Sequence, residues 1–291
     1  MKKKPTRGDH MFNTALTLSR SKVMGGFAAI FLAATSFATS AFAVTPEEIK
    51  AKGTATVGVQ MDQFPWGFID PKGQNDGFDI EIAKLIGKEL GVEVKFERIT
   101  GQNRIPLLVN GNVDFLVPSM TITEERAKVI QYVIPYSSND ITVWGKKDAA
   151  IKANEDLGKY VIGVNRGSAF DPLLVKVAPP NTQIKRFDDD ATTVQSLLSG
   201  QVDAIVGSIT YGLVIKQAGY DAQFERKYKV ADNFQGMAVR KGDKEMLAFL
   251  TDFVTRHTDD GTLDALYKKW IGVDRAKLPT TVPGVDFTGK Q

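Results

Sequence analysis

The segment GQNRIPLLVNGNVDFLVPSMTITEERAKVIQYVIPY, residues 101–136, strings two arginines and three Ser and Thr hydroxyls along short apolar runs. Its middle predicts a strand that leads into a helix starting near Glu124. Thr121 with Glu124 fits a capping box, and Thr123 fits an N-cap equally well. With either cap, hydroxyls, free backbone N–H groups and Arg126 meet at one helix N-terminus, which favours an anion. The segment therefore predicts a carboxylate-binding cleft, in which Arg126 can add a bidentate bond.

Two similar halves are indicated by a short pattern that occurs twice. Residues 108–114 read LVNGNVD and residues 197–203 read LLSGQVD, so each predicts a helix that ends at glycine before a buried strand. Short strands alternate with helices along the whole chain, which indicates α/β sheets. The predicted strands are residues 54–59, 92–96, 113–117, 160–164, 183–187 and 204–206. The predicted helices are residues 78–90, 103–110, 191–199, 244–257 and 262–270. Two further strands, near residues 141–144 and 236–240, are predicted to cross between the two halves.

An ordered set of motifs runs through the chain. NRIPLL at 103–108, GxVD at 111–114 and SxTxTxxR at 119–126 are its central members. The others are GFDI at 77–80, PY at 135–136, DLGK at 156–159, GS at 167–168 and DGTL at 260–263. This set resembles the family 3 periplasmic solute-binding proteins of polar amino acid uptake systems. The resemblance implies a type II periplasmic binding protein fold, in which two α/β lobes are joined by a two-strand hinge.

The same resemblance implies a division of the chain between the lobes. Residues 44–143 form the first part of lobe 1, residues 144–237 form lobe 2, and residues 238–291 return to lobe 1. The 248 residues that follow residue 43 are near the length at which one core divides into two.

The first 43 residues have the pattern of an export signal. Six Lys and Arg residues precede an apolar run at about residues 23–37, and Ala41-Phe42-Ala43 fits a cleavage site. The apolar run is shorter than the roughly 20 residues that a membrane span needs. We therefore expect cleavage after Ala43 and a periplasmic protein, whether translation starts at Met1 or at Met11.

Composition excludes several classes of partner and chemistry. Removing residues 1–43 takes away six of the 37 Lys and Arg and one of the 34 Asp and Glu, which leaves 31 against 33. This near-neutral balance gives no electrostatic case for nucleic acid or a membrane surface. The chain has no cysteine, and His257 is the only histidine after residue 43. We therefore expect no disulfide, metal site, cofactor or catalytic triad.

In lobe 1, the family pattern places the α-carboxylate of the ligand on Arg126. Ser119 and Thr121 would assist, and Met120 lies in the same ligand-binding segment. A charge-assisted bond contributes roughly 1.5 to 3 kcal/mol, whereas a buried guanidinium without a partner is costly. A carboxylate on Arg126 would therefore favour closure of the lobes. Without the surrounding motifs, Arg126 would fit a solvated helix surface.

Other lobe 1 positions depart from the family. Arg104 stands where acidic amino acid binders hold a side-chain carboxylate, although a salt bridge to Asp62 or Asp114 fits equally well. Gln63 replaces the aromatic residue that usually stacks on the ligand, so it favours a polar side chain. Gln60 replaces a second arginine of the glutamate and aspartate binders, which weakens the case for an acidic ligand.

In lobe 2, Ser168 and Ala169 correspond to the hydroxyl pair that meets the carboxylate on closure, and Ala169 has lost its hydroxyl. Ser208 stands where the family usually holds the α-ammonium with an aspartate. A neutral hydroxyl bond contributes only about 0.5 to 1.5 kcal/mol. Either the ligand has no α-ammonium, or another acid replaces the missing one. Asp190 aligns with a ligand-contacting position of acidic binders, and it also fits a plain N-cap.

The resemblance implies a monomeric transport receptor that captures a polar amino acid by its carboxylate and delivers it to an inner-membrane ABC permease. Two alternatives stay open. Ser208 suits a binder of a non-amino organic acid. Cyclohexadienyl dehydratases also resemble these proteins, and such an enzyme needs a general acid, for which Asp190 is the cleft candidate.

Overall fold

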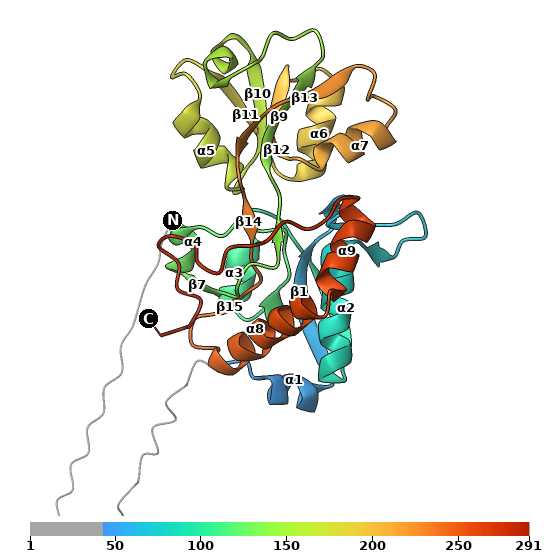
Figure 1. Cartoon of the computed structure of the whole chain (residues 1–291), viewed down its shortest axis with the longest axis vertical. Helices are drawn as coiled ribbons and strands as arrows, with labels where there is room; N and C mark the ends of the chain where they lie inside the picture. The colour runs from blue at the N-terminus through green and yellow to red at the C-terminus, as the bar shows by residue number, and fades with distance from the viewer. Residues whose placement is uncertain (1–42, 291) are drawn as a thin grey trace, which may run out of the picture. The chain divides into compact units, whose positions relative to one another are not determined.

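Residues 43–290 are described by the computed structural model. They form two α/β lobes that each contain a five-stranded sheet (Figure 1). The predicted export signal lies outside these residues, except for Ala43. Between residues 43 and 290, no helix is both long and apolar enough to cross a membrane.

Lobe 1 is built on a mixed sheet. Its strands are β1 (Thr54–Gln60), β5 (Glu93–Ile99), β6 (Phe115–Leu116), β7 (Ile130–Tyr132) and β15 (Ala238–Arg240). The order is β5-β1-β6-β15-β7, with β1 parallel to β5 and β6, and β15 antiparallel to β6 and β7. The last four residues of β1 are all buried, as expected for a parallel strand that is covered on both faces.

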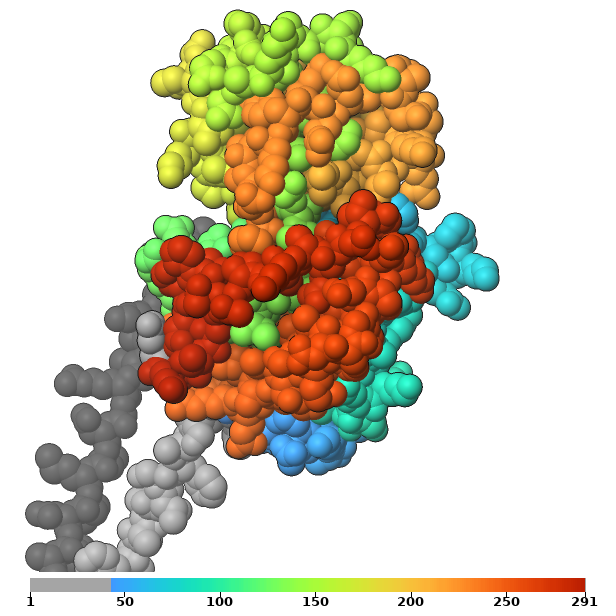
Figure 2. Space-filling view, viewed as in Figure 1, coloured from blue at the N-terminus to red at the C-terminus, as the bar shows by residue number. Residues whose placement is uncertain are grey.

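Helices cover this sheet on both sides. One apolar cluster joins β1 to α1 (Pro46–Lys52), α2 (Phe78–Leu90), α8 (Lys244–Asp259) and α9 (Thr262–Ile271). A second cluster contains residues of α3 (Arg104–Val109) and of α4 (Glu124–Ala127). The residues after α9, red in Figure 2, continue over lobe 1. There Arg275 Nη1 donates to the backbone O of Tyr136 at 3.0 Å. The C-terminal part of the chain therefore belongs to lobe 1.

A small antiparallel sheet follows β1 and supports one side of the cleft. It consists of β2 (Asp62–Gln63), β3 (Gly67–Ile69) and β4 (Asn75–Asp76). Trp66, in the turn between β2 and β3, is fully buried in the lobe 1 core. This anchor fixes the position of β2, which carries Gln63.

Lobe 2 repeats the architecture of lobe 1. Its strands are β9 (Ile141–Lys146), β10 (Val161–Asn165), β11 (Gln183–Phe187), β12 (Ala204–Ser208) and β13 (Phe224–Ala231), in the order β11-β10-β12-β9-β13. The helical elements are the 3-10 helix η1 (Asn154–Lys159), α5 (Phe170–Val177), α6 (Asp190–Leu198) and α7 (Tyr211–Gln217). Two apolar clusters share these elements, one containing α5 and the other α6 and α7.

The lobes are joined by two short strands, β8 (Ser137–Ser138) and β14 (Phe234–Gln235), which pair antiparallel. The predicted crossings near 141–144 and 236–240 are displaced from this pair. β9 already pairs with β12 and β13 from Ile141 onward, and β15 belongs to lobe 1. The apolar runs beside the crossings gave a clear strand pattern, whereas the crossing strands are two residues long and partly polar.

The strand ends of both lobes meet at the cleft. β1 ends at Gln60, β10 ends at Asn165 and β12 ends at Ser208. In open α/β sheets, ligands bind outside the carboxyl ends of the parallel strands. We therefore expect the ligand site to include residues at these strand ends.

Candidate ligand-binding site

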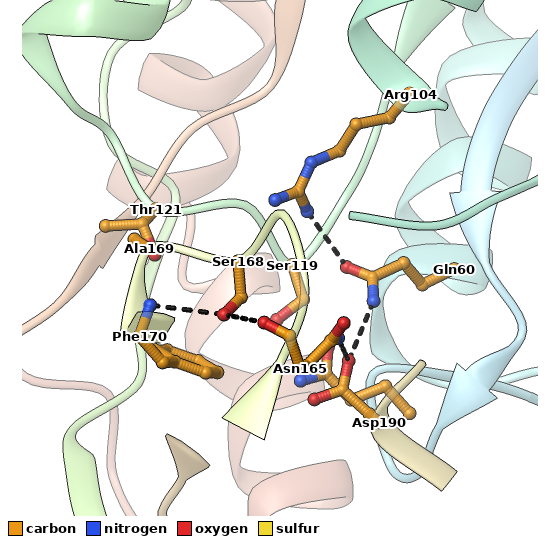
Figure 3. A pocket seen from close by; sticks show the side chains of 10 residues that line it. Gln60, Arg104, Ser119, Thr121, Asn165, Ser168, Ala169, Phe170 and Asp190 are labelled. Atoms are coloured by element: carbon orange, nitrogen blue, oxygen red, sulfur yellow. Dashed lines mark hydrogen bonds between the residues drawn. The ribbon is translucent and has the colours of Figure 1, made fainter. Parts of the chain in front are cut away.

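Ten residues from both lobes surround one small cavity (Figure 3). They are Gln60, Gln63, Arg104, Ser119 and Thr121 from lobe 1, and Asn165, Ser168, Ala169, Phe170 and Asp190 from lobe 2. The enclosed space is about 10 Å³, which is the room that one water molecule needs. A solute of amino acid size needs more room than this space offers.

Arg126 is held at the start of α4, beside the cavity. Thr123 is the N-cap of this helix, because its Oγ1 accepts from the backbone N of Arg126 at 3.3 Å. The guanidinium donates from Nη1 to the backbone O of Thr121 at 2.9 Å and from Nη2 to the backbone O of Gly167 at 3.0 Å. Arg126 thus spans from lobe 1 to lobe 2 without a carboxylate partner among the described residues.

Arg104 reaches the same lobe 2 carbonyl. Its Nη2 donates to Gly167 O at 3.3 Å, and its Nη1 donates to Gln60 Oε1 at 3.3 Å. Arg104 is 4% exposed, and its Nε has no partner. Its pKa is lowered to about 9, first by burial and then by the charge of Arg126. Two guanidiniums around one carbonyl oxygen make this end of the cavity favourable for an anion.

The structure shows neither of the two salt bridges considered for Arg104. Asp114 does not pair with it, because that carboxylate binds Lys52 Nζ at 2.8 Å. Asp62 forms no ion pair with it within 4 Å, although the Asp62 charge acts to raise the Arg104 pKa. Arg104 is therefore a cavity-lining cation with two neutral acceptors.

Asp190 gives the cavity a negative end. Its Oδ2 accepts from Gln60 Nε2 at 3.1 Å and from Asn165 Nδ2 at 2.9 Å (Figure 3), and its Oδ1 accepts from the Tyr211 hydroxyl. Asp190 is buried, with 3% of its surface exposed. The pKa of Asp190 is raised to about 7, first by burial and then by the neighbouring Asp62 carboxylate. Asp190 is thus a buried acid inside the cleft, and three hydrogen-bond donors hold its carboxylate in place.

The plain N-cap role considered for Asp190 belongs to its neighbour. Asp189 is the N-cap of α6, and its Oδ1 accepts from the backbone N of Thr192 at 2.7 Å. Asp190 is the first residue of the helix, so its carboxylate is free to face the cavity.

Ser119 and Ser168 are positioned by neighbouring polar groups. Ser119 Oγ accepts from the Gln235 side-chain amide, which comes from the connecting strand β14. Ser168 Oγ donates to the backbone O of Asn165 at 2.6 Å and accepts from the backbone N of Phe170 at 3.2 Å (Figure 3). Ala169 is the N-cap residue of α5 and has no side-chain cap bond. Both hydroxyls therefore already have partners.

Besides Arg126, which lies beside the cavity, two predicted site residues do not line it. Met120 is fully buried in the apolar cluster of α3. In an extended segment, successive side chains point to opposite faces, so Met120 faces the core while its two neighbours face the cavity. Ser208 is fully buried, and its Oγ donates to Asn139 Oδ1 at 2.8 Å and lies 2.6 Å from Thr210 Oγ1. The Ser208 hydroxyl is committed to protein partners.

Three lining residues were not among the predicted site residues: Gln60, Asn165 and Phe170. Gln60 and Asn165 could have been found from their place at the carboxyl ends of predicted parallel strands. Phe170, 5% exposed, directly follows the predicted Ser168-Ala169 pair. Its apolar character gave no signal for a cleft position.

Further contacts between the lobes frame the cavity. Trp66 Nε1 donates to Thr210 Oγ1 at 3.2 Å, and the backbone N of Asp190 donates to Asp62 Oδ2 at 3.0 Å. Gly101 and Gly167 meet backbone to backbone, because a Cβ on Gly101 would lie 2.7 Å from the O of the residue before Gly167. Within residues 43–290, no group of three His, Cys, Asp or Glu side chains could hold a metal ion.

Comparison with known proteins identifies the family of this chain. The family model of the bacterial extracellular solute-binding proteins, family 3, matches residues 55–273. The chain belongs to this family. The resemblance inferred from the ordered motifs is thereby confirmed, and so is the predicted fold of two α/β lobes joined by two strands.

Several relatives of this solute-binding protein are described as binding amino acids. It is 29% identical to the L-cystine-binding protein TcyJ of Escherichia coli strain K12, over 89% of this chain and 98% of the relative. It is 35% identical to the glutamine-binding protein GlnH of Bacillus subtilis strain 168, over 79% of this chain and 85% of the relative. A solved ancestral amino acid-binding protein, described as a precursor of cyclohexadienyl dehydratase, has a TM-score of 0.72 and 34% identity, covering 77% of this chain and 98% of its own.

Proposed function

We propose that this solute-binding protein captures a polar amino acid between its lobes and delivers it to an inner-membrane ABC permease. The observation that carries the proposal is the polarity of the cavity, with two guanidiniums at Gly167 O and the Asp190 carboxylate among its lining residues. An amino acid has the same two charges. The names of the cystine-binding and glutamine-binding relatives support this choice of solute.

In this proposal, the α-carboxylate binds Arg126, assisted by Ser119 and Thr121. The guanidinium now donates to a neutral carbonyl at 3.0 Å. A carboxylate offers charge-assisted, bidentate bonds, which are about twice as strong as neutral ones. Ser168 and the start of α5 complete the site from lobe 2, so the ligand favours the arrangement in which both lobes contact it.

The location and partners follow from family membership and sequence. We propose that residues 1–43 are an export signal, that cleavage after Ala43 releases a periplasmic protein, and that it acts as a monomer. Membership of an extracellular solute-binding family supports export. The proposed partner is the permease, which would recognise the closed lobes.

A dehydratase-like enzyme is the second candidate function. It is favoured by the ancestral relative and by Asp190, whose pKa of about 7 suits a general acid. Against it, three side-chain donors already point at the two Asp190 oxygens, an arrangement that suits an accepting carboxylate. We therefore propose that the chain is not an enzyme. Turnover of prephenate or arogenate by the purified protein would contradict this.

A binder of a non-amino organic acid is the remaining alternative, because Ser208 offers no charge to an ammonium. It is separated from amino acid binding by titration calorimetry. Residues 44–291, stripped of ligand by unfolding and refolding, are titrated with the common L-amino acids, L-cystine and their deaminated counterparts. Binding of an amino acid supports the proposal, and binding of deaminated acids alone contradicts it.

Arg126→Ala tests the site itself. Affinity for the amino acid that binds should fall roughly 10-fold to 150-fold, because a charge-assisted partner of the carboxylate is lost. Lys128→Ala is the matched control, since Lys128 caps the same short helix and its side chain is 65% exposed. Unchanged affinity in Arg126→Ala, with an intact thermal transition, would place the carboxylate elsewhere.

A further inference from the structure

Three buried oxygen atoms near Asp190 have no hydrogen-bond partner. They are Gln63 Oε1, Asn165 Oδ1 and Asp62 Oδ1. Gln63 and Asn165 are 3% and 2% exposed, and both line the cavity. Buried acceptors without a donor carry the full penalty of desolvation. Several such acceptors around one acid indicate that a donor group belongs among them.

The orientation of the Asn165 amide is fixed by its partner. Its Nδ2 donates to Asp190 Oδ2 at 2.9 Å, so a flipped amide would turn an oxygen toward a carboxylate. Asn165 Oδ1 therefore stays an acceptor without a donor. Asp62 is held in a similar way, because its other oxygen accepts from the backbone N of Asp190 at 3.0 Å.

The charges around these acceptors point to a cation. Asp190 and Asp62 place two carboxyls side by side across the lobes, and burial raises the pKa of both. The oxygens of Gln63 and Asn165 add two buried acceptors that have no donor. A positively charged group would relieve the repulsion between the two acids. An ammonium has three donors and no acceptor, which matches this set.

We propose that Gln63, Asn165 and Asp190 form the subsite for the α-ammonium of the ligand, with Asp62 adding negative charge behind them. The inference rests on the proposed amino acid function. Ser208 does not serve, because its hydroxyl is bound to Asn139 and Thr210. Arg104 and Asp190 line one cavity of about 10 Å³. The anion and cation that they receive are therefore close neighbours, as an α-carboxylate and an α-ammonium are.

The test compares each amino acid with the same molecule lacking its ammonium. Calorimetric titration uses L-glutamine against 4-carbamoylbutanoate and L-cystine against 3,3′-dithiodipropionate, after the full amino acid panel has been run. For an amino acid that binds, the wild-type protein should prefer it to its deaminated counterpart by roughly 10-fold to 150-fold, the range of one charge-assisted bond. The measured quantity is this ratio, which a purely structural role of Asp190 would not change.

Asp190→Asn should reduce the ratio to below about threefold, while binding of the deaminated acid changes little. Gln63→Met, which removes one amide acceptor and keeps the side-chain length, should reduce the ratio by a smaller factor. Ser208→Ala is the control and should leave the ratio unchanged. Thermal unfolding of each variant checks that the fold is retained.

The outcomes separate the subsite from the proposed function. If an amino acid binds and Asp190→Asn keeps the wild-type ratio, the subsite is overturned and the proposed function stands. A wild-type ratio near one overturns the subsite in the same way. If no amino acid of the panel binds, both the proposed function and the subsite are overturned.

Discussion

Replacing Gly101 with alanine is expected to hold the lobes apart without changing the cavity lining. A Cβ on Gly101 would lie 2.7 Å from the backbone O of Arg166, 3.0 Å from the C of Gly167 and 3.2 Å from the N of Ser168. All three atoms are backbone atoms of lobe 2, so none can move aside as a side chain can. Gly101 does not have a positive φ, so alanine suits its own backbone conformation.

The magnitude follows from the cost of overpacking. Inserting a methyl group into a filled space typically costs about 1 to 3 kcal/mol. The contact exists only when the lobes meet, so the cost falls on the closed arrangement alone. Apparent affinity should therefore fall roughly 5-fold to 150-fold, by a similar factor for every solute that is bound between closed lobes.

The assay is calorimetric titration with the amino acid that binds, together with small-angle X-ray scattering at saturating ligand. Gly145→Ala in β9 is the matched control, because a Cβ there meets its nearest atoms at 3.5 Å, all within lobe 2. An unchanged dissociation constant and an unchanged radius of gyration in Gly101→Ala would refute the reasoning. The lobes of the bound protein would then not approach each other at these glycines.

Three further predictions concern buried acids. Asp79 is 1% exposed and accepts from the Tyr136 hydroxyl at 2.7 Å, and burial raises its pKa well above the usual 3.8. The protonated Asp79 carboxyl therefore contributes fully to stability below about pH 4, and this contribution is lost as pH rises. Asp79→Asn should flatten the fall in the free energy of unfolding in urea above about pH 4; an equally steep profile would contradict this. The pKa of Asp190 is raised from 3.8 to about 7 where the lobes meet, so the closed fraction of ligand-free protein should fall as pH rises across that window. Scattering between about pH 4 and 8 measures it, and Asp190→Asn, which keeps Asp62 and Arg104 in place, should remove most of the change. Finally, the backbone N of Val44 donates to Asp243 Oδ1 at 3.2 Å. A chain that starts at Val44 should be roughly 1 kcal/mol more stable than one that keeps Ala43, because its α-ammonium makes a charge-assisted bond to Asp243. Thermal unfolding of the two chains measures this difference in stability. If the difference persists in Asp243→Asn, the bond between Val44 and Asp243 is not its cause.

Elements with clear local signals were predictable from sequence. α2 spans the predicted residues 78–90, because its apolar period is regular and a glycine with φ 70° ends it. β11 also has its predicted limits, 183–187. The connecting strands β8 and β14 were displaced in the prediction, because pairs of residues are too short to show a period. Their pairing depends on contacts between residues nearly a hundred positions apart.

The candidate site was predictable where a motif carries the chemistry. Seven of the ten predicted residues line the cavity, and Arg126 lies beside it. Met120 was predicted to line the cleft but lies in the core. Because side chains alternate in an extended segment, assigning Ser119 and Thr121 to the cleft would have assigned Met120 to the core. Ser208 could not be assigned from sequence, since its partner Asn139 lies 69 residues away. The same holds for Arg104, whose acceptors come from Gln60 and from the other lobe.

The arrangement of the two lobes along the chain bears on how the protein folds. Lobe 2 is one continuous segment between β8 and β14, with its own apolar clusters. Lobe 1 joins β1 to α8 and α9 across that whole segment, so its core needs both ends of the described chain. Closing such a long loop is entropically unfavourable and slows formation of the contacts that depend on it. Lobe 2 is therefore expected to fold first. Lobe 1 can complete its core only after α8 and α9 have been synthesised.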